Sequence, residues 1–466
     1  MDKKYKKIEF KKLDGGAGQL YYDPLKPNKI YTSEFIKPNI ATGRIELAEY
    51  LFPTVAHSGY QSLGLNAFST TSITLPDGVI LHLVIDNTNS YITVAKQDDI
   101  SDTSLTAIHT FPADSDRAYI IVYYKGKVCI FYRRTGSLIA YAYSTDDGDT
   151  MVADDALAHG EPLGYHISAD NTLFVFTATK IIYTTDGISW IVYHELASTD
   201  DQFTGFTELD GEYYAIISNA YDRSYFVKFD NDNNPVNLRK MNVNGYGTCY
   251  AFNNKIYIAI NGVSKYNFFI WDKADLNFLF QIDSEVVNTY KFLMHDDEYL
   301  YFACYRKLVR INKNDGYYIM EDNFGANIVG LYIDGANIYV TLSNGTTHYF
   351  YLKRHYSSYN PTGFFTTPYI RERQQPGFLV ITHQPLAANT TITIVADLNN
   401  AGVYTTTVKS VNTDGTTRTV VDLKAIAECD SLSFKVTLAD SSRLNGVVDI
   451  ELTYLYLPLG VENSIK

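Results

Sequence analysis

Seven segments of the chain share one pattern of polar and hydrophobic positions. Each begins with a short polar turn and continues as a strand of alternating apolar and aromatic residues, as in LPDGVILHLVI from Leu75 and FNNKIYIAI from Phe252. Aligned on the turn, the segments place equivalent strand residues 38 to 48 positions apart, at Leu81, Cys129, Phe174, Tyr214, Tyr257, Tyr301 and Tyr339. An apolar period of two predicts strands rather than helices, and the regular spacing predicts repeated β units.

A repeat of about 40 to 50 residues that contains several strands is typical of a β-propeller, in which each repeat forms one four-stranded blade. We therefore predict a propeller of about seven blades over residues 55–356, with the alternating Tyr, Phe and Ile side chains buried between blades. Residues 1–54 are interpreted as an N-terminal extension. The segment PNKIYTSEF around Tyr31 is either an eighth copy or the strand that closes the ring.

The pattern changes after the last repeat. Residues 357–367 include SSYNPTGFFTT, which is rich in Ser, Asn, Pro and Gly and indicates a linker. Over residues 368–466 Tyr becomes sparse, and six or more Thr- and Val-rich strands alternate with turns such as NTDGT. This predicts a C-terminal antiparallel β-sandwich, so the expected fold class is all-β.

Composition limits the partners of the chain. Its 466 residues carry a net charge of -13, which disfavours a surface that wraps nucleic acid. The first twelve residues, MDKKYKKIEFKK, are basic and indicate a solvated tail, or a contact with an acidic partner or nucleic acid. We find no signal-peptide pattern and no run of about 18 apolar residues, so no membrane span is expected. The four Cys stand far apart and are expected to be buried free thiols.

Two stretches resemble the Asp-box turn of sialidases and related propellers. YSTDDGDTM places Ser144, Asp146, Gly148 and Thr150 in the pattern, and YTTDGISW places Thr184, Asp186, Gly187 and Trp190. The two Asp are 40 positions apart, so both are expected at the same place in successive blades. We interpret the box as structural, because the Asp accepts backbone N–H groups, the Gly supplies a positive φ, and the Trp covers the hairpin.

Other patterns give no catalytic residue, cofactor or metal site. A sialidase needs three Arg, a Tyr and Glu pair and an Asp acid, and GRIEL around Arg44 is a poor match to the usual start. No HExxH, Walker loop or GxGxxG occurs. His295 with Asp296 and Asp297 indicates a solvated turn, and the acidic run DGDTMVADD offers a weaker calcium alternative.

The two ends of the chain carry a family resemblance. IEFKKLDGGAGQLYYDP and SEFIKPNIATGRIELAEYLF, with Gly15, Gly16, Glu34, Asn39 and Gly43, are similar to the opening of tail nozzle or tail tubular proteins of short-tailed phages. GFFTTPYI at residues 363–370 resembles the opening of β-sandwich modules at the ends of phage tail proteins.

The resemblance implies a non-enzymatic structural protein of a bacteriophage tail, either a nozzle or ring subunit or a fibre-attaching one. It would be made in the host cytoplasm and located in the virion, with other tail proteins and a homo-oligomeric ring of its own copies as partners. Host-surface contact is a further option, and DNA would be met only by passage through a lumen. The alternative is a glycan-binding or sialidase-like propeller with a carbohydrate-binding sandwich.

Overall fold

The computed structural model describes the strands and most of the turns of the chain. The described residues are 4–11, 32–34, 36–39, 44–47, 67–86, 91–98, 105–111, 115–134, 138–154, 160–219, 224–241, 245–262, 265–283, 292–297, 299–304, 306–312, 317–321, 327–334, 337–343, 348–353, 362–372, 374–383, 385, 391–411, 417–439 and 447–456. Every regular element among them is a β-strand, which confirms the all-β prediction.

Seven antiparallel sheets follow one another along the chain, as expected for a β-propeller of about seven blades. The first three sheets consist of β5 (Ala67–Thr74), β6 (Ile80–Asp86), β7 (Tyr91–Gln97) and β8 (Thr106–Thr110); β9 (Ser115–Tyr124), β10 (Lys127–Arg134), β11 (Leu138–Ser144) and β12 (Val152–Asp154); and β13 (Pro162–Ile167), β14 (Leu173–Thr177), β15 (Lys180–Thr184) and β16 (Ile191–Glu195).

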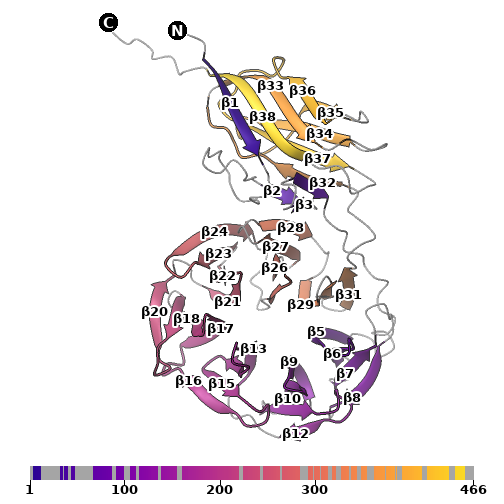
Figure 1. Ribbon diagram of the computed structural model, residues 1–466, viewed down its shortest axis with the longest axis vertical. Coiled ribbons are helices and arrows are strands. Elements are labelled where there is room, and N and C mark those ends of the chain that lie inside the picture. The colour runs from indigo at the N-terminus through magenta and orange to yellow at the C-terminus, as the bar shows by residue number, and fades with distance from the viewer. Residues whose placement is uncertain are drawn as a thin grey trace. The chain divides into compact units, whose positions relative to one another are not determined.

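The fourth and fifth sheets consist of β17 (Asp201–Leu209), β18 (Glu212–Asn219), β19 (Tyr225–Phe229) and β20 (Pro235–Lys240), and of β21 (Tyr246–Phe252), β22 (Lys255–Asn261), β23 (Lys265–Trp271) and β24 (Leu276–Asp283). The last two consist of β25 (Phe292–His295), β26 (Tyr299–Cys304), β27 (Lys307–Asn312) and β28 (Tyr317–Glu321), and of β29 (Asn327–Asp334), β30 (Asn337–Ser343) and β31 (His348–Lys353). Figure 1 shows these sheets around a common centre, with first strands such as β9 and β17 innermost.

The repeated turn of the sequence is the hairpin between the first and second strands of each sheet. All seven equivalent residues lie on a second strand, in β6, β10, β14, β18, β22, β26 and β30. Six of them have described side chains, and each is buried: Leu81, Cys129, Phe174, Tyr214, Tyr257 and Tyr301. The sequence period therefore marks the buried second strand of every blade.

The propeller core consists of layers between neighbouring sheets. One cluster joins Leu81 and Val94 of the first sheet to Ile130 of the second, and further clusters join the second to the third, the third to the fourth and the fourth to the fifth. At the closure of the ring β29 contacts β5, and the Tyr332 hydroxyl donates a hydrogen bond of 2.6 Å to Thr74 Oγ1. The seventh sheet thus contacts the first directly.

The N-terminal strands belong to the C-terminal sandwich, which corrects two sequence-based expectations. Strand β1 (Lys4–Lys11) pairs with β38 (Val447–Tyr456), and β2 (Thr32–Glu34) pairs with β32 (Thr362–Thr366). The proposed ring-closing strand near Tyr31 therefore lies at the sandwich, and the last part of the predicted linker 357–367 is a sandwich strand. Gly15, Gly16 and Gly43, which carried part of the phage resemblance, lie outside the described residues.

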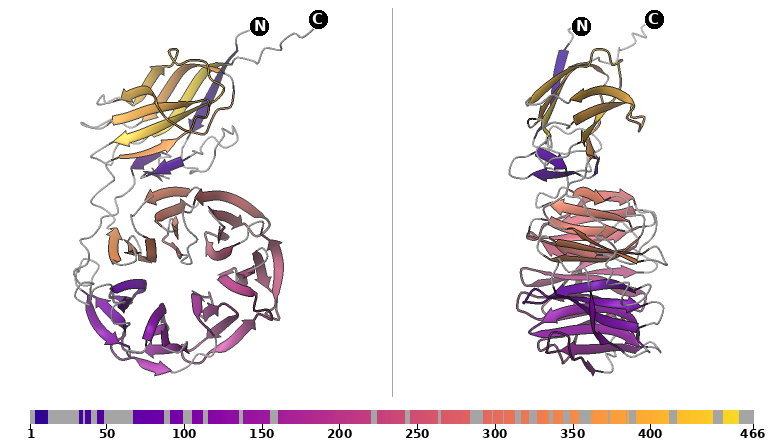
Figure 2. Two further views of the ribbon diagram at one scale, coloured as in Figure 1. Left: turned by 180° about the vertical axis from the view of Figure 1, so that it is seen from behind. Right: turned by 90° about the vertical axis from the view of Figure 1, so that its right-hand side faces the viewer.

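The sandwich consists of two sheets that face each other (Figure 2). One contains β3 (Ile36–Asn39), β4 (Arg44–Leu47), β38, β33 (Gln374–His383) and β36 (Arg418–Asp422), with β1 also on β38. The other contains β2, β32, β37 (Leu432–Ala439), β34 (Thr391–Leu398) and β35 (Thr406–Val411).

The basic start of the chain forms a strand because its apolar residues alternate with lysines. Phe10 is 0% exposed and Ile8 is 8% exposed. The Lys6 ammonium binds Glu372 Oε1 at 2.8 Å, so the polar face is also in use. The high lysine content suggested a solvated tail. Instead, the alternation of apolar residues with lysines lets the segment form a strand that pairs with the edge of β38.

The cysteines with described side chains are buried free thiols, as predicted, at Cys129, Cys249 and Cys429. Burial raises the pKa of Cys129 and of Cys429 to about 11, and it also raises the pKa of Cys249. These thiols therefore stay protonated at neutral pH and act as small apolar side chains.

The position of β1 can be tested with Phe10→Ala. Loss of a fully buried Phe should destabilise the sandwich by about 3 to 5 kcal/mol, measured by urea unfolding. Val420→Ala, at a side chain that is 54% exposed on the same module, should change stability by less than about 0.5 kcal/mol. Equal effects of the two changes would contradict a buried β1.

Candidate functional site at the blade hairpins

Both predicted Asp-boxes lie in the hairpin between the third and fourth strands of a sheet. In the second sheet the box begins at Ser144, the last residue of β11, and in the third sheet it begins at Thr184, the last residue of β15. The structure therefore places the two boxes at the same position in successive blades, as the 40-residue spacing predicted. The remaining box residues are Asp146, Gly148, Thr150, Asp186, Gly187 and Trp190.

Hydrogen bonds within the hairpin engage the first box. The Ser144 hydroxyl donates to Asp146 Oδ1 at 2.6 Å, and the same carboxylate oxygen accepts the Thr150 backbone N–H at 2.8 Å. The Gly148 N–H donates to Ser144 Oγ at 2.9 Å. The Ser144 hydroxyl, followed by Thr150, lowers the pKa of Asp146 to about 2. The carboxylate is therefore ionised at neutral pH and acts as a hairpin acceptor.

The second box repeats this arrangement with more backbone donors. Asp186 Oδ1 accepts the Ile188 and Ser189 N–H groups at 2.8 Å each, and the Thr184 hydroxyl at 2.9 Å. The hydrogen bond from the Ser189 N–H, followed by that from the Ile188 N–H, holds the pKa of Asp186 well below its usual range. In both boxes the aspartate thus accepts backbone N–H groups of its own hairpin, as the sequence predicted.

The boxes also fasten each blade to the preceding one. A Cβ on Gly148 would lie 3.2 Å from Leu81 Cδ1 in the first sheet, and one on Gly187 would lie 3.3 Å from Tyr124 in the second. The Tyr141 hydroxyl donates to the Gly187 carbonyl, and Lys125 Nζ donates to the Thr185 carbonyl at 2.9 Å. The box of one blade therefore packs on the repeat turn and second strand of its neighbour.

Trp190 contributes to the same junction rather than only covering its own hairpin, as the sequence suggested. Its ring centroid lies 5.2 Å from that of Phe131 and 5.4 Å from that of Tyr141, both edge-to-face and both in the second sheet. The aromatic residue at the end of the box is thus part of the core between two blades.

Two further blades carry an equivalent aspartate that the sequence analysis missed. In the fourth sheet Asp230 Oδ1 accepts the Asp232 and Asn234 N–H groups at 3.0 and 2.8 Å. In the fifth, Asp272 Oδ1 accepts those of Ala274 and Asp275 at 3.2 and 2.9 Å. These turns lack the Gly of the box, and Asn233 and Lys273 supply the positive φ instead. An Asp directly after the apolar third strand was the available signal.

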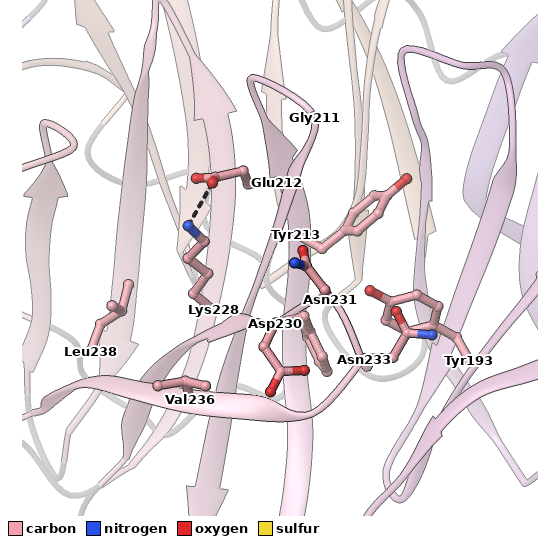
Figure 3. A pocket seen from close by; sticks show the side chains of 11 residues that line it. Tyr193, Gly211, Glu212, Tyr213, Lys228, Asp230, Asn231, Asn233, Val236 and Leu238 are labelled. Atoms are coloured by element: carbon pink, nitrogen blue, oxygen red, sulfur yellow. Dashed lines mark hydrogen bonds and ion pairs between the residues drawn. The ribbon is translucent and has the colours of Figure 1, made fainter.

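A polar groove lies between the two hairpins of the fourth sheet that point the same way (Figure 3). The last pair between β18 and β19 is Tyr214 with Lys228, so the two turns beyond this pair are separate. The groove has a volume of about 490 Å³. It is lined by Tyr193, Gly211, Glu212, Tyr213, Lys228, Phe229, Asp230, Asn231, Asn233, Val236 and Leu238.

One end of the groove holds an ion pair. Lys228 Nζ lies 2.5 Å from Glu212 Oε1, and the Tyr214 hydroxyl donates to Glu212 Oε2 at 2.9 Å. The bond from Lys228, and then that from Tyr214, lowers the pKa of Glu212. The charge of the lysine is therefore largely neutralised by its neighbour.

The other end is aromatic. The centroids of Tyr193 and Tyr213 lie 5.6 Å apart, and those of Tyr193 and Phe229 lie 5.4 Å apart, in edge-to-face contacts. The pKa of Tyr193 is raised to about 12, and the pKa of Tyr213 is also raised. Burial is the main cause in both cases. Both phenols are therefore neutral hydrogen-bonding groups at physiological pH.

Two histidines of the propeller, the buried His82 and the half-buried His166, contact polar side chains of the sheets. His82 bridges Ser72 Oγ at 2.8 Å and Gln97 Oε1 at 2.9 Å, and all three side chains are buried in the first sheet. His166 Nε2 lies 3.7 Å from Glu208 Oε2 between the third and fourth sheets, and burial lowers the pKa of His166 against the opposing effect of Glu208.

His295 is exposed, in agreement with the prediction of a solvated turn, and its ring lies 5.6 Å from that of Tyr250. Asp296 beside it accepts the Tyr299 N–H and the Tyr301 hydroxyl, each at 2.7 Å. Within the described parts of the chain, no group of three His, Cys, Asp or Glu is placed to hold a metal ion. The same residues include no helix of a length and apolarity suited to crossing a membrane.

No family model matches the sequence, and no curated protein matches it. Among solved structures, YCF48 bound to a D1 peptide is similar with a TM-score of 0.44 and 12% identity over 63% of this chain and 96% of that chain. A functionally unknown protein from Desulfotomaculum acetoxidans has a TM-score of 0.39 and 11% identity, with coverage of 56% and 90%. A chain of the nidogen/laminin complex has a TM-score of 0.34 and 12% identity, with coverage of 52% and 94%. Likenesses of this size leave the function to be argued from the residues.

The contact between blades at the box can be tested with Gly148→Ala. Gly148 has a φ of +97° and close neighbours, whereas Gly78 has a φ of +92° and no atom within 4 Å of an added Cβ. We expect Gly78→Ala to cost about 1 to 2 kcal/mol from backbone strain alone. Gly148→Ala should cost at least about 1 kcal/mol more, because the methyl group also overpacks the junction. Equal losses in thermal unfolding would contradict the packing role.

The ionised box aspartate gives a pH prediction. Because its folded pKa of about 2 lies below an unfolded value near 4, Asp146 stabilises the fold above about pH 4 and loses this contribution as the pH falls towards 2. The difference in melting temperature between wild type and Asp146→Asn should therefore shrink from pH 5 to pH 2. A difference independent of pH over this range would show that the charge is irrelevant.

Proposed function

We propose that the chain is a non-enzymatic structural component of a bacteriophage tail, either a nozzle or ring subunit or one that attaches fibres. One observation carries the proposal. Strand β2 pairs directly with β32, with Ser33 opposite Phe365 and Glu34 opposite Phe364. The N-terminal SEF and the C-terminal GFFTT segments, which separately resemble phage tail proteins, are therefore neighbouring strands of one sheet. Their joint resemblance is explained if this sandwich is the shared module.

The use of charged groups in the propeller supports a role in assembly. The aspartates of the two sequence boxes accept hydrogen bonds inside their own hairpins, and the box glycines pack on the preceding blade. These groups build a rigid rim. A rigid module that presents loops and strand edges suits a subunit that binds neighbouring tail proteins and its own copies.

The acidic balance fits the same proposal. A net charge of -13 suits a ring whose lumen is crossed by DNA, since an acidic wall repels the phosphate backbone and lets DNA slide. In this role the protein is made in the host cytoplasm and resides in the virion tail.

A second candidate is a glycan-binding propeller, and a specific observation favours it. The groove at the fourth sheet combines two tyrosines with two carboxylates and two side-chain amides. A sialidase-like propeller is less well supported than a glycan-binding one. Asp146 and Asp186 of the two boxes accept hydrogen bonds within their own turns.

The tail proposal is tested on phage particles. Particles purified from a lysate of the source should contain the chain by peptide mass spectrometry, and an antibody against the sandwich should label the tail in electron micrographs. Native mass spectrometry of the purified chain should show a closed oligomer or assembly with tail proteins. A stable monomer absent from every particle would overturn the proposal, and turnover of a fluorogenic sialoside would favour the sialidase-like alternative.

A further inference from the structure

We propose that the groove between the β17–β18 and β19–β20 turns binds a neutral saccharide. The proposal deepens the second candidate function, rests on the same groove, and does not depend on the role in a phage tail.

The groove has the size and lining of a ligand site. Its volume of about 490 Å³ lies inside the range of roughly 300 to 1,000 Å³ typical of small-molecule pockets. Most of its lining side chains are polar, and Phe229, Val236 and Leu238 add apolar surface. Figure 3 shows the ion pair of Glu212 and Lys228 at one end and the two tyrosines at the other.

The charges of the groove select against anions. Lys228, the one cationic side chain among the described residues of the lining, lies 2.5 Å from the carboxylate of Glu212. Asp230 adds a second carboxylate, so the ionised groups leave an excess of one negative charge. A phosphate, a sialic acid or a nucleotide would meet repulsion, whereas a neutral ligand would not.

The polar groups match a ligand with many hydroxyls. Asp230 is held by two backbone N–H bonds to Oδ1, and no hydrogen bond of Oδ2 occurs among the described residues. The amides of Asn231 and Asn233 are exposed, and each offers both donors and an acceptor. A sugar hydroxyl also both donates and accepts. Asp230 can therefore accept hydrogen bonds from neighbouring hydroxyls of one sugar ring, and the two amides can both donate to such hydroxyls and accept from them.

The tyrosines supply the complementary apolar surface. A pyranose ring carries C–H groups on its faces and hydroxyls at its edges, so it pairs an aromatic contact with peripheral hydrogen bonds. The Tyr193 ring packs edge-to-face against Tyr213 at 5.6 Å and against Phe229 at 5.4 Å. Rigid aromatic side chains provide contact area with little loss of conformational entropy.

Lysines bridge two of the junctions between neighbouring blades. Lys125 reaches the Thr185 carbonyl between the second and third sheets, and Lys273 pairs with Asp210 between the fourth and fifth. The residue after the turn aspartate is Lys273 in the fifth sheet and Asn231 in the fourth. Among the described residues no lysine spans from the fourth-sheet turn to the third sheet, and these two sheets are joined instead by the Ala169 N–H, which donates to Glu208 Oε2 at 2.8 Å.

The test is a glycan array of neutral and anionic oligosaccharides probed with the labelled full-length chain, followed by calorimetry on the best neutral saccharide. We expect neutral saccharides to bind and sialylated or sulfated ones not to bind. Asp230→Asn keeps an oxygen acceptor for the turn but removes the charge, and Tyr213→Phe removes a hydroxyl. Each should weaken binding at least ten-fold, and Asp230→Asn should lower the melting temperature no more than Asp272→Asn does.

Asp272→Asn is the matched control, because it makes the same change in the equivalent turn of the fifth sheet. It should leave the affinity unchanged, as should EDTA. Lack of neutral saccharide binding across the array would overturn the proposal, and so would binding that Asp230→Asn and Tyr213→Phe leave intact. Incorporation of Asp230→Asn into particles tests the tail role separately.

Discussion

The propeller depends on the burial of both faces of each sheet against its neighbours. All five residues of β14 (Leu173–Thr177) are buried, although neighbouring residues of a strand point to opposite faces. A single sheet would expose these rows to water, at about 25 cal/mol for every Å² of apolar surface. Each blade is therefore stable only between two others, and the contact of β29 with β5 covers the last open faces.

The hairpins of the rim fix the spacing between blades. In four successive sheets an aspartate accepts backbone N–H groups of its own turn, at Asp146, Asp186, Asp230 and Asp272. Three of these turns contact the preceding blade, through Gly148, through Gly187, and through Lys273. In the fourth sheet the turn that carries Asp230 also lines the groove. A rigid structural rim thus includes a place where a ligand can be held.

Local patterns were sufficient for the repeating parts of the fold. The turn and strand pattern located the second strand of all seven sheets, and the box motif located two hairpins. The N-terminal region was misjudged because Ile8 and Phe10 alternate inside a lysine-rich segment that is also compatible with a solvated tail. Its partner β38 lies at the other end of the sequence, and β32 begins inside a stretch with the composition of a linker.

The sequence by itself determined which segments form strands, where the hairpins turn and how each box aspartate is used, because these features depend on residues within a few positions of one another. Only the tertiary structure decided that the two ends of the chain share a sandwich, that Trp190 packs on the preceding blade, and that Tyr193 and Asp230 line one groove. Those contacts join residues on different strands and sheets. They arise when closure of the ring and pairing of sheet edges bring these distant segments together.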